Sequence, residues 1–108
     1  MTMEIIFHEH HATVSDHMRQ RASAGVRRLT DRFARVVDAV VRFEQDGPTR
    51  RVEIILRAPR QKRLVAKAEG RYFGPTLVEV LAKLRGQIAA MKKPTRARAA
   101  RSRVLARA

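Results

Sequence analysis

The densest group of chemically active side chains is the run HEHH at residues 8–11, which places three imidazoles and one carboxylate side by side. His17 follows six positions after the run. Imidazole and carboxylate groups are zinc ligands, so a metal-dependent enzyme or a metal sensor is one hypothesis. In an extended chain, however, the first and third residues of the run point away from the second and fourth. At most two imidazoles converge easily, fewer than the ligands zinc takes, so we expect a polar loop and neither a metal nor a cofactor.

A second pattern consists of arginines that recur along the segment after this run. On a helix with 100° per residue, four of them fall within about 60° of one another on one flank. These four residues are Arg21, Arg28, Arg32 and Arg35. The guanidinium group is a planar fork that pairs with phosphate in bidentate fashion. Asp31 is the one acidic residue between Arg21 and Arg35, so the pattern favours contact with a polyanion over a merely solvated helix face.

The overall charge agrees with this interpretation. The 108 residues include 24 Lys plus Arg and 10 Asp plus Glu, a formal net charge of +14. Residues 94–108 hold five Arg and no acid, so the rest of the chain keeps 19 basic against 10 acidic residues, a net +9. A nucleic acid is the expected partner. No recognition-helix or zinc-finger pattern is present, which favours contacts to phosphates and to shape over base reading.

Motifs of catalysis are missing from the sequence. It contains no Cys, no GxxxxGK phosphate loop, no HExxH and no nucleophile elbow. We therefore expect a protein that is not an enzyme and has no small-molecule substrate. No apolar run approaches the 18 or so residues of a membrane span, and the first residues do not resemble a signal peptide. The expectation is a cytoplasmic protein without a membrane partner.

Hydrophobic periodicity predicts the elements that position these residues. Four segments alternate apolar and polar side chains as β-strands do, namely residues 3–8, 36–44, 51–58 and 63–69. An apolar repeat after Ser15, a suitable N-cap, predicts a helix over residues 16–34, in which Gly25 allows close approach to the sheet. Gly74 and Pro75 open a second helix.

The end of the second helix sets the predicted domain boundary. Lys92 and Lys93 suit the C-terminal end of a helix dipole, and Pro94 is expected to end the helix. The following segment is rich in Arg and Ala and has no sustained apolar face. We therefore predict one folded domain over residues 1–93 and a flexible basic tail over residues 94–108.

The predicted order is β-α-β-β-β-α, which belongs to the α+β class. Each helix has one apolar stripe and each strand one apolar face, so both helices should pack on one face of a four-stranded mixed sheet. The opposite sheet face carries charged residues and should be exposed. On the second helix, Arg85 and Lys92 share a flank, while Lys83 and Lys93 lie elsewhere on its exposed surface. If the two helices are neighbours, these groups and the first-helix arginines could border one basic groove.

With this element order, the phrases FHEHHATVSDHMR (7–19) and KLRGQI (83–88) resemble the ribosome hibernation promoting factor family, also called ribosome-associated inhibitor or sigma-54 modulation proteins. The similarity spans about residues 3–93. The matching positions are Val14 and Ser15 at the first helix, and Lys83, Leu84, Gln87, Lys92 and Lys93 in the second. The chain looks like a short, divergent form: Glu9 stands where the family often has Gly, and the C-terminal dimerisation domain of longer members has no counterpart.

The resemblance implies a factor that binds rRNA of the small ribosomal subunit in the tRNA and mRNA channel and inhibits translation by idle ribosomes. It implies rRNA contacts at Arg21, Arg28, Lys83, Lys92 and Lys93. Helical spacing adds Arg32, Arg35 and Arg85 to this set. The alternative is a double-stranded RNA-binding or histone-like accessory protein without ribosome specificity, because a related α-β-β-β-α topology binds RNA helices by shape. The extra first strand argues against it, and the sequence leaves the oligomeric state open.

Overall fold

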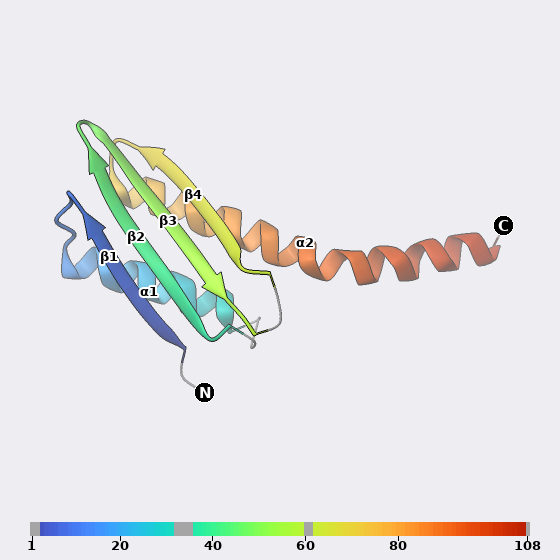
Figure 1. The fold of residues 1–108 in the computed structure, drawn as a ribbon. Helices are drawn as coiled ribbons and strands as arrows, with labels where there is room; N and C mark the ends of the chain where they lie inside the picture. Colours follow the sequence, from blue (N-terminus) through green and yellow to red (C-terminus); the bar gives the residue numbers. More distant parts are fainter. Residues whose placement is uncertain (1–2, 32–35, 60–61, 108) are drawn as a thin grey trace.

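A computed structural model of the 108-residue chain describes residues 3–31, 36–59 and 62–107, and it describes side chains as far as Met91. The elements occur in the order β1 (Glu4–His10), α1 (Asp16–Thr30), β2 (Asp38–Asp46), β3 (Thr49–Arg57), β4 (Leu64–Gly70) and α2 (Phe73–Arg107). Figure 1 shows the strands as one sheet with both helices behind it. The predicted element order and the α+β class are confirmed.

The four strands form one mixed sheet in the order β1-β2-β3-β4. β1 runs parallel to β2, because α1 carries the chain back across the sheet between them. The other two neighbouring pairs are antiparallel. The tight turn between β2 and β3 contains Gly47, whose φ of 59° lies in the left-handed region that favours glycine.

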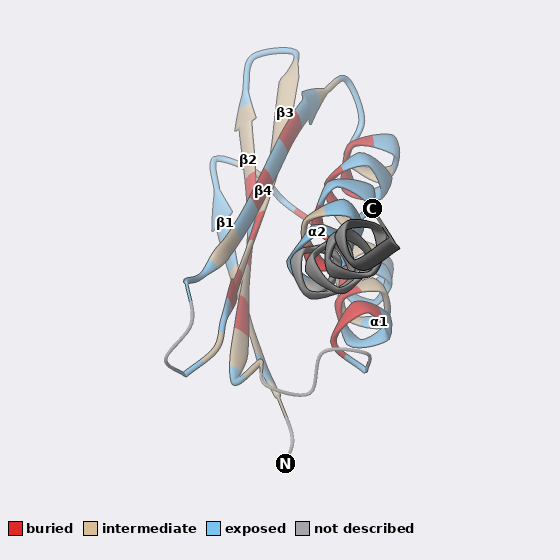
Figure 2. Cartoon of the chain, turned by 90° about the vertical axis from the view of Figure 1, so that its right-hand side faces the viewer, coloured by how far each residue is buried: buried red, intermediate tan, exposed pale blue. Residues whose placement is uncertain are grey.

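The hydrophobic core lies between the sheet and the two helices. Figure 2 shows both helices on one side of the sheet and no element on the other side, as predicted. The largest fully buried side chains are Phe43, Ile54, Leu56, Leu77, Leu84, Val26, Val41, Val52 and Val80. Phe43 lies at the centre of an aromatic cluster: its ring centroid is 6.5 Å from that of Phe7 and 5.4 Å from that of Phe73. These contacts join β1, β2 and the start of α2.

The histidine run is more regular than predicted. β1 continues through His10, because it pairs with β2 as far as the register partners His10 and Glu44. His10 is therefore a strand residue and not a loop residue. His11 makes the turn with a φ of 52°. The predicted N-cap of α1 is confirmed, because the Ser15 hydroxyl oxygen accepts a hydrogen bond from the Met18 N–H at 3.1 Å.

The predicted helix ends differ from the structure. The structure has α1 end at Thr30, whereas a helix over residues 16–34 was predicted, and residues 32–35 lie outside the described residues. The expected stop before Pro94 is wrong, since α2 continues to Arg107. Proline removes one N–H and crowds the carbonyl four residues earlier, but the Ala and Arg residues around it have high helix propensity. The flexibility of residues 94–108 stays a prediction. No helix within the described ranges is long and apolar enough to cross a membrane.

Candidate nucleic-acid interface

A groove of about 280 Å³ lies between α1 and α2. The helix α1 contributes Arg21, Ala24, Gly25, Arg28 and Leu29, and α2 contributes Leu77, Val78, Leu81 and Arg85. The aliphatic members make its floor apolar, whereas all three arginines are exposed to solvent. The groove therefore combines guanidinium groups from both helices with an apolar surface between them.

Gly25 brings the two helices close together. A Cβ atom at this position would lie 2.5 Å from Cδ1 of Leu81, far inside ordinary van der Waals contact. The glycine therefore allows close approach to α2 and not, as predicted, to the sheet. Gly74, at the start of α2, is less constrained, because a Cβ atom there would lie 3.3 Å from Nη1 of Arg21, the end of a flexible side chain. Gly25 is therefore the glycine that lets α2 pack closely against α1, while the Arg21 side chain reaches the start of α2.

The groove arginines are not paired with carboxylates in the part of the chain that the structure describes. Among the residues that the structure describes, Arg21, Arg28 and Arg85 form neither an ion pair nor a side-chain hydrogen bond. Three like charges around one groove repel one another, and an anion placed between them would relieve that repulsion. The electrostatics of the groove therefore favour a polyanion such as a nucleic acid.

The arginines on the open face of the sheet differ from those of the groove. Arg57 donates from Nε to Asp38 at 2.6 Å and from Nη2 at 2.9 Å. Arg51 donates from Nε to Glu69 at 2.7 Å. These hydrogen bonds are the main reason that the pKa of Arg57 and that of Arg51 are raised above their ordinary value.

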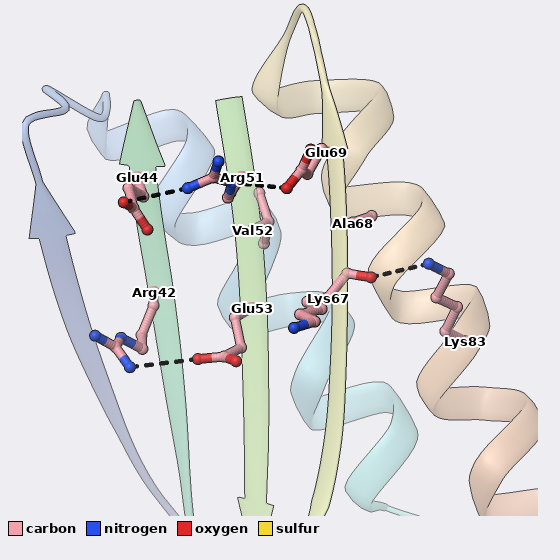
Figure 3. Close-up of a pocket in the computed structure, with 9 residues that line it drawn as sticks. All are labelled: Arg42, Glu44, Arg51, Val52, Glu53, Lys67, Ala68, Glu69 and Lys83. Atoms are coloured by element: carbon pink, nitrogen blue, oxygen red, sulfur yellow. Dashed lines mark hydrogen bonds and ion pairs between the residues drawn. The ribbon is translucent and has the colours of Figure 1, made fainter. Parts of the chain in front are cut away.

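Figure 3 shows the ion pairs of Arg51 with Glu44 and Glu69 on this face, and that of Arg42 with Glu53 at 3.4 Å. A phosphate that approached these arginines would compete with carboxylates already in place. The open face is therefore a poor site for a polyanion, and the helix side is the better one.

The structure brings together part of the predicted RNA-binding set. Arg21, Arg28 and Arg85 meet at the groove, as the helical spacing predicted. Arg32 and Arg35 lie outside the described residues, and so do the side chains of Lys92 and Lys93. Their part in RNA binding stays a prediction.

Lys83 projects to the other side of α2, away from the groove. Its Nζ donates to the carbonyl oxygen of Lys67 at 2.8 Å (Figure 3). The same Nζ lies 3.8 Å from Oε1 of Glu79. Gln87, one helical turn later, donates from Nε2 to the carbonyl oxygen of Val65 at 2.8 Å. Both acceptors belong to β4, an edge strand of the sheet. The two side chains thus occupy carbonyl groups that an exposed edge would otherwise offer to another strand.

Sequence reasoning missed this contact and also missed Ala24 and Val78 of the groove. Helical spacing placed Lys83 only on the exposed surface of the second helix, and Gln87 was noted only through the resemblance, so neither gave a sign of binding to the edge of the sheet. Val78 lines the groove with 55% of its surface exposed. It falls outside the regular apolar stripe of α2, and an aliphatic residue on the otherwise polar flank was the signal that could have identified it.

The histidine run lies apart from the groove. The ring centroids of His10 and His11 are 4.3 Å apart. Arg19 donates to Glu9 at 2.6 Å and also to Asp16, so the carboxylate of the run is directed towards α1. The bonds to Asp16 and then to Glu9 raise the pKa of Arg19. Within the described ranges, no three His, Cys, Asp or Glu residues gather closely enough to hold a metal ion.

The fold and the groove define a small, strongly basic α+β protein with a cationic groove on its helix side. The model of one protein family, described as sigma 54 modulation protein / S30EA ribosomal protein, matches residues 5–96 of this chain. The chain belongs to that family of ribosome-associated proteins.

Several solved structures share the fold, and two of them illustrate the likeness. A ribosomal subunit interface protein from Coxiella burnetii aligns with a TM-score of 0.77 and 18% identity over 84% of this chain and 99% of its own. The N-terminal domain of Protein Y from Thermus thermophilus aligns with a TM-score of 0.69 and 18% identity over 84% and 99% of the two chains. At these identities the likeness concerns the fold alone. No curated protein sequence matches the chain.

Proposed function

We propose that this protein binds rRNA of the small ribosomal subunit in the tRNA and mRNA channel and thereby keeps idle ribosomes from translating. Membership of a ribosome-associated family supports the ribosome as the partner. One structural neighbour is described as a ribosomal subunit interface protein, which agrees with a site on the face of a subunit. The observation that carries the proposal is the groove, where Arg21, Arg28 and Arg85 form no ion pair with any described residue.

The groove suits an RNA backbone for two physical reasons. Guanidinium groups from both helices can donate to successive phosphates, and each neutralised phosphate releases counterions. The apolar floor, with Val78 exposed, offers a surface for ribose and base faces. Such contacts recognise the shape and charge of folded RNA without reading base edges. The remaining basic residues of the predicted set would extend the contact beyond the groove.

The proposed mechanism is steric and requires no chemical reaction. A bound domain would fill space that tRNA and mRNA need, so inhibition would last as long as the protein stays bound. The strength of inhibition would then follow the occupancy of the channel and decline as salt weakens phosphate contacts. No catalytic residue is assigned, in agreement with a family of ribosome-associated proteins that are not enzymes.

Co-sedimentation with purified small subunits tests the proposal. The wild-type chain should migrate with the subunits in a sucrose gradient, and added tRNA and mRNA should displace it. The double variant Arg21→Glu with Arg28→Glu should migrate free. The matched control, Arg42→Glu with Arg57→Glu on the open sheet face, should still bind. Equal affinity for small subunits and for an unrelated RNA duplex would refute ribosome specificity and favour a general RNA-binding protein.

A further inference from the structure

The open face of the sheet carries an ordered pattern that the proposed function does not use. The strand register places four aliphatic side chains next to one another across all four strands. They form an apolar row that consists of Ile6, Val40, Ile55 and Val65. Val65 is 36% exposed and the other three are half-buried. Figure 2 shows that no described helix covers this side of the sheet, so the row faces solvent.

Rows of charged residues flank the apolar row on both sides, two residues away along each strand. The first charged row consists of Glu4, Asp38 and Arg57. The second charged row, on the other side, consists of His8, Arg42, Glu53 and Lys67. Beyond it follow His10, Glu44, Arg51 and Glu69. Neighbouring positions within these rows often carry opposite signs.

The balance of charge on this face is unlike that of the whole chain. The rows contain five of the chain's ten acidic residues and four basic residues, although the chain as a whole carries a formal charge of +14. A nearly neutral face has little attraction for a polyanion. It is also a face on which two copies of this basic chain can approach each other without strong repulsion.

We propose that the open face binds a second copy of this chain in a symmetric dimer whose two-fold axis runs along the apolar row. This rotation places the apolar row of one copy on that of the other. It also places the first charged row of each copy on the second charged row of its partner. Asp38 then faces Arg42 of the second copy, and Arg57 faces Glu53 of the second copy. The pattern is self-complementary on the two central strands, β2 and β3.

The size of the face determines how strong the dimer is. Strands about 4.8 Å apart and about 3.3 Å per residue give this face an area of roughly 400 Å² per copy. The total, about 800 Å², lies below the 1,200–2,000 Å² that stable interfaces bury. The dimer is therefore weak and forms only at high protein concentration. Both helix layers lie on its outside, so the grooves stay accessible and the inference does not depend on the proposed function.

Sedimentation equilibrium of the full chain over about 10 to 500 µM in about 0.15 M salt tests the inference, a range that suits a weak interface. The average mass should rise from 12.3 kDa towards twice that value as concentration increases. Asp38→Arg alone and Arg42→Asp alone should each remain monomeric, because like charges then face each other across the axis. An equimolar mixture of the two variants should form a heterodimer, because opposite charges face each other again.

Matched controls separate this arrangement from a general effect of charge. The control for Asp38→Arg is Glu79→Arg, which changes the net charge equally but lies on α2. The control for Arg42→Asp is Arg27→Asp, which lies on α1. These controls should dimerise like the wild-type chain. Ile55→Thr, which keeps a β-branched residue in the apolar row, should weaken the dimer about fivefold or more without unfolding the sheet. A wild-type chain that stays monomeric, or a mixture that does not associate, would overturn the inference.

Discussion

Neutralising the three groove arginines should weaken RNA binding far more than neutralising three arginines on the open sheet face. The test variant replaces Arg21, Arg28 and Arg85 with Gln. The control variant makes the same replacement at Arg42, Arg51 and Arg57, each of which has a carboxylate partner. The two variants lose the same net charge and receive the same new residues. They differ in the face of the molecule that changes and in whether the replaced arginines are paired with carboxylates.

The expected size of the effect follows from the number of unpaired guanidinium groups. Each phosphate contact contributes about 0.7 to 0.9 to the slope of log affinity against log salt, so three contacts contribute about 2 to 3. At about 0.15 M salt, the same contacts account for roughly a 50- to 150-fold difference in affinity. The open face is about 10 Å or more from the helix layer, beyond a Debye length of about 8 Å. The affinity of the control variant for RNA should therefore decrease less than about fivefold.

Fluorescence anisotropy with a labelled fragment of small-subunit rRNA, at four or five salt concentrations, measures both the affinity and the slope. Circular dichroism should show that both variants remain folded, because exposed ion pairs contribute at most about 1 kcal/mol each. If both variants lost affinity equally and with equal change in slope, net charge alone would explain binding. The assignment of the groove would then be wrong.

Three further predictions concern stability. Ser15→Ala removes the N-cap of α1 and should lower the free energy of unfolding by about 1 kcal/mol in urea titrations; an unchanged midpoint would show that the 3.1 Å bond contributes nothing. Phe43→Ala, at the centre of the aromatic cluster, should lower the free energy of unfolding by about 3 to 5 kcal/mol in the same titration. A decrease below about 1 kcal/mol would contradict the packing described for β1, β2 and α2. Gln87→Ala and Lys83→Ala should each lower the free energy of unfolding by about 0.5 to 1.5 kcal/mol, because each exposes the edge of β4. Arg85→Ala should leave this free energy nearly unchanged but weaken RNA binding. If Lys83→Ala instead weakened RNA binding without changing stability, Lys83 would be chiefly an RNA contact.

Much of the fold could be predicted because its signals are local. Alternation identified all four strands, and the apolar repeats identified both helices, with strand ends displaced by a few residues. The spacing of Arg21 and Arg28 was enough to place them on one helix flank, and the structure confirms that they line one groove. The end of α2 was predicted wrongly, because proline is a strong but local obstacle that neighbouring helix-forming residues can outweigh.

The sequence by itself determined the element order, the apolar faces, the excess of positive charge and the helix flank that carries arginine. Tertiary structure alone decided which charges remain unpaired, because Arg57 meets Asp38 through strand register and Lys83 meets the edge of β4 through helix packing. Register also aligned Ile6, Val40, Ile55 and Val65 into one row. The physical reason is that periodicity fixes the direction of a side chain relative to its own backbone. Its neighbours from distant segments depend on how those segments pair and pack.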